Sequence, residues 1–189
     1  TATTFGSVTA GGADMVFIKK LTASADANLT FVDGASSVVL DSTYKEYLFT
    51  FNNIHPATDD SKLLVNFRDG GTNYDATKTT TFFRAQHSEG GANGNLSYRT
   101  DDDLAQSTAA QPLTMDIGNA NDESASGEMI LYNPSSTTFV KHFIANANCV
   151  YSGDYSMQSF VAGYCNVTAA IDAVQFTMEG GTNIDSGDI

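Results

Sequence analysis

Residues 44–53 read YKEYLFTFNN, and this stretch decides the fold. Successive side chains of a β-strand point to opposite faces of the sheet, so Tyr47, Phe49 and Phe51 share one face with Asn53. That face is aromatic at its centre. The stretch therefore predicts a strand that packs its aromatic side on a hydrophobic core.

Similar short runs recur along the chain, separated by Gly, Asn, Asp and Ser, which favour turns. No segment has a sustained helical period. The pattern predicts strands at residues 14–22, 27–32, 37–41, 44–53, 61–68, 79–87, 126–133, 138–149, 157–167 and 171–178. We expect an all-β protein: a single antiparallel two-sheet β-sandwich domain over residues 1–189, with a jelly roll as the expected topology.

The alternation within these strands also predicts the core. Tryptophan is absent, so Phe and Tyr must supply its aromatic rings. Residues that share the inward face of their strand should be buried. The predicted inward set is Phe49, Phe51, Val65, Phe67, Phe83, Ile130, Tyr132, Phe143, Val161 and Phe176.

Residues 88–126 form a long excursion between strands, rich in Gly, Asn, Asp, Ser and Ala. Long loops in compact domains are usually functional or mobile, so this segment is the predicted outward surface. The candidate exposed residues are Ser88, Asn93, Asn95, Asp101, Asp102, Asp103, Asp116, Asp122 and Glu123. A calcium site among these carboxylates is the less favoured reading, because neither cluster has the spacing of a calcium-binding loop.

The net charge limits the classes of partner that this protein can bind. Nine basic and 22 acidic residues give a net charge of -13, which repels polyanions, so nucleic acid is not an expected partner. No apolar run approaches the roughly 20 residues that span a bilayer, so no membrane partner is expected either.

The two cysteines, Cys149 and Cys165, lie in neighbouring predicted strands, where pairing across the turn between them would allow a disulfide. The favoured reading is two buried free thiols.

No pattern predicts catalysis. The three histidines are scattered and no serine lies in a strained elbow between glycines. Glu46 and Glu128 are the only strand-borne glutamates, and without tryptophan the usual sugar-stacking platform is missing. We therefore expect no enzyme, no cofactor and no metal.

A set of short segments occurs in the same order in a known group of proteins. The segments are 41–59, 69–74, 79–85, 127–128, 133–143 and 161–164. On these segments the chain resembles structural proteins encoded by marine tailed bacteriophages, and the likeness covers roughly residues 14–189. The resemblance implies a β-sandwich component of the virion surface and offers no catalytic residue.

Two functions follow as hypotheses. One is a multi-copy structural protein of the virion surface, a capsid decoration or part of a tail or fibre, whose partners are other virion proteins and copies of itself, a trimer being one option. The alternative is a module that binds a carbohydrate or protein receptor on the host surface. An exposed apolar patch would favour docking, and a concavity lined by loops would favour receptor binding.

Overall fold

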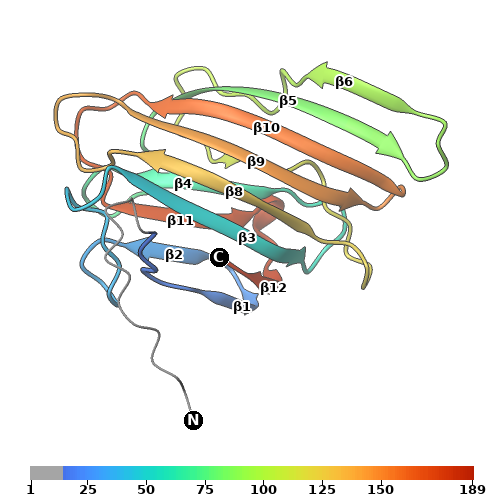
Figure 1. Cartoon of the computed structure of the whole chain (residues 1–189), viewed down its shortest axis with the longest axis horizontal. Coiled ribbons are helices and arrows are strands. Elements are labelled where there is room, and N and C mark those ends of the chain that lie inside the picture. Colours follow the sequence, from blue (N-terminus) through green and yellow to red (C-terminus); the bar gives the residue numbers. More distant parts are fainter. Residues whose placement is uncertain (1–14) are drawn as a thin grey trace, which may run out of the picture.

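A computed structural model describes residues 15–189, which form a β-sandwich of two antiparallel sheets (Figure 1). The larger sheet has the strand order β1-β12-β3-β8-β9-β10-β5-β6 and the smaller one the order β2-β11-β4-β7. In Figure 1 the larger sheet lies in front of the smaller one. The strands are β1 (Thr22–Asp26), β2 (Leu29–Val32), β3 (Glu46–Pro56), β4 (Leu63–Arg68), β5 (Lys78–Ser88), β6 (Gly94–Tyr98), β7 (Gln111–Pro112), β8 (Ala125–Tyr132), β9 (Lys141–Tyr151), β10 (Tyr155–Cys165), β11 (Ala173–Met178) and β12 (Ile184–Asp188).

The predicted all-β sandwich is confirmed, and the jelly roll is not. The described residues contain one short 3-10 helix, Glu179–Gly181, and no α-helix. The strands divide eight and four between the sheets, and β8, β9 and β10 are consecutive neighbours in the larger one. A jelly roll instead arranges eight strands as two Greek keys.

Strand β3 bears out the pattern of its sequence up to a bulge. Tyr47, Phe49 and Phe51 are buried, as predicted. The register then shifts between Phe51 and Ile54, and Asn53 takes a left-handed φ of 51°. Asparagine tolerates this conformation better than most residues. The bulge turns Ile54 inward and leaves Asn53 exposed, so the predicted inward position of Asn53 is wrong.

In two other strands the sequence assigned the inward face wrongly. Phe83 is 40% exposed, and the adjacent Phe82 fills the core instead. In β8 the predicted inward residues Ile130 and Tyr132 lie on the outer side, and their neighbours point inward. Both faces of these runs are apolar, so alternation could not distinguish them. The remaining seven predicted core residues are buried: Phe49, Phe51, Val65, Phe67, Phe143, Val161 and Phe176.

Several predicted strands differ from those that the structure contains. Residues 15–21 and 37–41 form no strand, and residue 14 lies outside the described residues. The segment 88–126 contains β6 and β7, which sequence patterns missed. Strand β12 was also missed, because its sequence IDSGD is polar and becomes a strand by pairing with β1 and β3.

The two cysteines lie at opposite ends of the β9–β10 hairpin. Cys149 is opposite Met157, whereas Cys165 is opposite Lys141. The two strands pair across the turn as predicted, but their register keeps the cysteines apart, so the disulfide alternative is not formed and the prediction of buried free thiols is confirmed. Burial raises the pKa of each thiol to about 12.

Candidate interaction surface

The predicted outward loop is only partly outward. Asn93, Asn95, Asp101 and Asp122 are exposed, and Asp103 and Asp116 are half-buried. Ser88, Asp102 and Glu123 are buried, which contradicts their predicted exposure.

Asp102 has a structural role, because Lys62 and Arg99 bind its buried carboxylate beneath residues 88–126. Its carboxylate lies 2.9 Å from Lys62 Nζ and accepts a hydrogen bond of 3.0 Å from Arg99 Nε. Burial alone would lower the pKa of Lys62, but Asp102, with Asp116 and Glu179 nearby, raises it. Removing one member of such a buried cluster leaves an uncompensated charge, so this acidic run anchors the loop to the sandwich.

Glu123 also has a structural role, in its own loop. Its Oε2 accepts a hydrogen bond of 2.7 Å from the backbone N–H of Ala120. Its carboxyl group occupies the space where a side chain at position 118 would be, so Gly118 is required there. Within the described part of the chain, no three side chains of His, Cys, Asp or Glu gather to hold a metal ion.

The outer face of the larger sheet carries a group of exposed apolar side chains. Directly opposed residues of antiparallel strands share a face, and one such row runs across five strands. Its members are Leu48, Ile130, Ile144, Ala162 and Thr81. Ile144, at the centre, is 50% exposed. The row makes a continuous apolar band across the sheet.

A second row adds aromatic rings to this band. Phe160 is opposite Phe83, and Phe83 is opposite Tyr98 on the edge strand β6. The rings of Phe83 and Phe160 stack with centroids 4.7 Å apart. Leu96, also on β6, is 70% exposed. We call the two rows, together with Leu96, the sheet-face patch.

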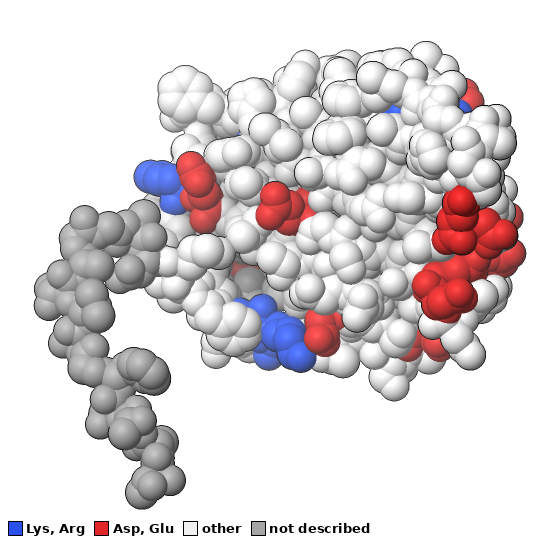
Figure 2. All heavy atoms as spheres, turned by 45° about the vertical axis from the view of Figure 1, so that its right-hand side comes forward, with Lys and Arg blue, Asp and Glu red and all other residues white. Residues whose placement is uncertain are grey.

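Charge is distributed unevenly around this patch. Figure 2, which views the molecule obliquely, shows a broad area without charged side chains and acidic residues gathered at one end. Asp59 and Asp60 are held by neighbouring turns: Asp59 accepts from the Asn119 N–H at 3.2 Å, and Asp60 accepts from the Ser152 hydroxyl at 2.6 Å. One acidic residue, Glu128, lies beside the sheet-face patch, because it is opposite Asn146, which is opposite Phe160.

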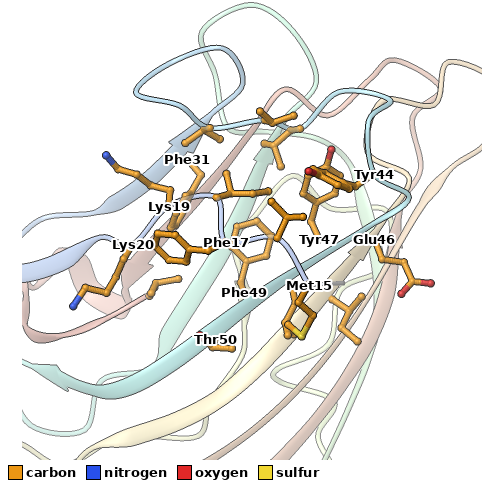
Figure 3. A pocket seen from close by; sticks show the side chains of 18 of the residues that line it. Met15, Phe17, Lys19, Lys20, Phe31, Tyr44, Glu46, Tyr47, Phe49 and Thr50 are labelled. Carbon is orange, nitrogen blue, oxygen red and sulfur yellow. The ribbon is translucent and has the colours of Figure 1, made fainter. Parts of the chain in front are cut away.

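A groove of about 840 Å³ opens beside the first half of β3. Residues 15–20 form one side and residues 46–50 of β3 the other. Figure 3 shows Phe17, Tyr44, Tyr47 and Phe49 around it. Phe17 is 80% exposed. We call this feature the β3 groove.

The two strand-borne glutamates do not form a catalytic pair. Glu128 is opposite Thr50, four residues along β3 from Glu46. At about 3.4 Å per residue, roughly 14 Å of strand separates their backbone positions along β3. Glycosidase carboxyl pairs are only about 5 to 10 Å apart.

Comparison with protein-family models, curated proteins and solved structures finds no match. Within residues 15–189, no helix has the length and apolar character needed to cross a membrane.

Proposed function

We propose that this chain is a non-enzymatic structural protein of a phage virion surface, present in many copies as a capsid decoration or as part of a tail or fibre. The sheet-face patch is the observation that carries the proposal. A contiguous exposed apolar patch is typical of a surface that another protein covers. The resemblance of the sequence to structural proteins of marine tailed phages supports the same setting.

The distribution of exposed groups favours docking over receptor binding. The largest row of apolar side chains crosses the strands of the larger sheet, and the β3 groove is lined by β3, residues 15–20 and residues between 38 and 45. Neither is a concavity formed by the loops of residues 88–126. In the proposed arrangement the sheet-face patch meets a neighbouring copy of the same protein, and the acidic end faces outward.

Analytical ultracentrifugation tests the role of the patch. Ile144→Lys places a charge at its centre, on an outward position where folding should be preserved. The control Asn121→Lys makes the same charge change at an exposed loop position near the acidic end. We expect wild type and control to self-associate and Ile144→Lys to stay monomeric. Monomeric wild type at every concentration, or equal association of all three proteins, would contradict the proposal.

Electron microscopy of intact particles tests the setting. We expect density for the sandwich at repeated positions on the virion surface, with the acidic end pointing away from the particle. A chain found beside the packaged genome would contradict the proposal.

A further inference from the structure

The first half of β3 has an open edge. Residues 46–51 pair with β8 on one side. On the other side β12 pairs with β3 only from Pro56 to Asn52, and the described residues place no strand beyond that point. An unpaired strand edge presents a row of free N–H and C=O groups to which another strand can add.

The open edge faces a space one strand wide. Strand β12 lies between β1 and β3, and neighbouring strands are about 4.8 Å apart, so β1 and β3 are about 10 Å apart. Leu21, just before β1, exchanges backbone hydrogen bonds of 2.8 and 2.9 Å with Ile189. Beyond Ile189 the line of β12 leads into the β3 groove, between residues 15–20 and 46–50.

Beside this groove the aromatic side chains of the core are slightly exposed to solvent. Phe31, Tyr47 and Phe49 line it and are 4–7% exposed, whereas Phe67, Phe143 and Phe176 elsewhere in the core are fully buried. A strand in the groove would place alternate side chains over these three rings. Such burial is favourable only for apolar side chains, so the groove selects a segment with apolar residues at every second position.

The charges lining the groove are balanced, unlike those of the whole chain. Lys19, Lys20 and Lys45 offset Glu46, Glu128 and Asp188. The chain as a whole has a net charge of -13. The groove is therefore suited to a segment with little net charge, and it does not add to the repulsion of an acidic neighbour.

We propose that the β3 groove accepts an extended peptide segment with alternating apolar residues, antiparallel to β3 and in line with β12. The segment comes from a neighbouring protein of the assembly, and this source rests on the proposed function. Main-chain hydrogen bonds to residues 46–51 supply affinity, and the rings beneath select the alternate side chains. This is recognition by strand addition.

Peptide binding tests the proposal directly. The probe is the neutral peptide acetyl-Asp-Thr-Val-Thr-Val-Thr-Val-Lys-amide, whose β-branched residues favour an extended conformation. Two matched controls carry N-methyl groups on all threonines or on all valines, so each loses the N–H donors along one edge. We expect the probe to bind, and the control whose methyl groups lie along the edge that faces β3 to bind at least about tenfold more weakly because several hydrogen bonds are lost.

Hydrogen–deuterium exchange then locates the peptide. The probe should slow exchange of the alternate amides of residues 46–51 that point away from β8, and amides of β9, which is paired on both sides, should be unchanged. Equal binding of the probe and both methylated controls would overturn the proposal. In dilute protein without peptide, slow exchange of those same amides, which point away from β8, would also overturn it, because the protein's own chain would then fill the groove.

This experiment is separable from the test of the proposed function. Self-association without slowed exchange at residues 46–51 would overturn the strand proposal and leave the proposed function standing. Binding of the probe by a protein that never self-associates would support the groove as a strand acceptor and overturn the proposed function.

Discussion

Lys78 should make the stability of this protein depend on pH in the alkaline range. Its side chain is fully buried, and its ammonium group donates hydrogen bonds to Asn66 Oδ1 at 2.5 Å and to the Ala76 carbonyl at 2.8 Å. Within residues 15–189 no carboxylate forms an ion pair with it. Burial therefore lowers the pKa of Lys78 to about 8 from its ordinary value of 10.5.

The sign of the effect follows from proton binding. Between pH 8 and 10.5 the unfolded chain holds the proton on Lys78 more tightly than the folded protein does, so stability rises as pH rises through this window. Each pH unit within the window is worth about 1.4 kcal/mol. From pH 7 to pH 10 the free energy of unfolding should increase by about 2.5 kcal/mol through this residue alone.

The substitution Lys78→Met isolates this contribution, because titrating groups that do not interact with Lys78 affect the variant and the wild type alike. Cys165 does interact with Lys78, but burial raises its pKa to about 12, so it keeps its proton in the folded protein at pH 7 and at pH 10. Urea titrations at pH 7 and pH 10 would measure the free energy of unfolding of both proteins. We expect the stability of wild type relative to Lys78→Met to increase by about 2.5 kcal/mol between these pH values. The control Lys45→Met removes an exposed lysine and should keep the wild-type pH dependence. A difference between wild type and Lys78→Met that stays constant with pH would refute the reasoning.

Three further predictions concern the core. Phe51→Ala should lower the free energy of unfolding by about 3 to 5 kcal/mol, because a large side chain leaves a cavity. Phe83→Ala on the outer face should cost much less, and equal losses in denaturant titrations would mean that the inner face is misassigned. Cys149 and Cys165 should resist iodoacetamide in the native protein and react after unfolding, since burial disfavours the thiolate; rapid native labelling in a mass measurement would contradict this. Gly127→Ala should destabilise the protein by about 1 to 3 kcal/mol, because the new Cβ would overlap the backbone of β9, and a thermal melt unchanged from wild type would disprove the overlap.

Sequence patterns were reliable where the two faces of a strand differ in polarity. In β3 the aromatic side chains alternate with more polar residues, so the inward face could be predicted as far as Phe51. The bulge at Asn53 could not, because it depends on pairing with β8 and β12. Ile130 and Phe83 were assigned to the wrong face because each has an apolar neighbour that is equally suited to the core.

The sheet-face patch was only partly visible in the sequence. Its members come from strands far apart in the chain, and the row from Leu48 to Thr81 exists only through the register of four strand pairs. Asp102 is a second case in which the sequence alone did not reveal the position of a residue. Three adjacent aspartates indicate a solvated loop, and only the tertiary structure brings Lys62 to the middle one.

The sequence by itself therefore determined the class of fold, the seven correctly placed core residues and the burial of both thiols. These depend on alternation and composition, which act locally along the chain. The tertiary structure decided the strand β12, the apolar rows across the larger sheet and the open edge of β3. Each of these is set by pairing between segments distant in sequence, and the hydrogen bonds that fix such a register leave no local signal in either segment alone.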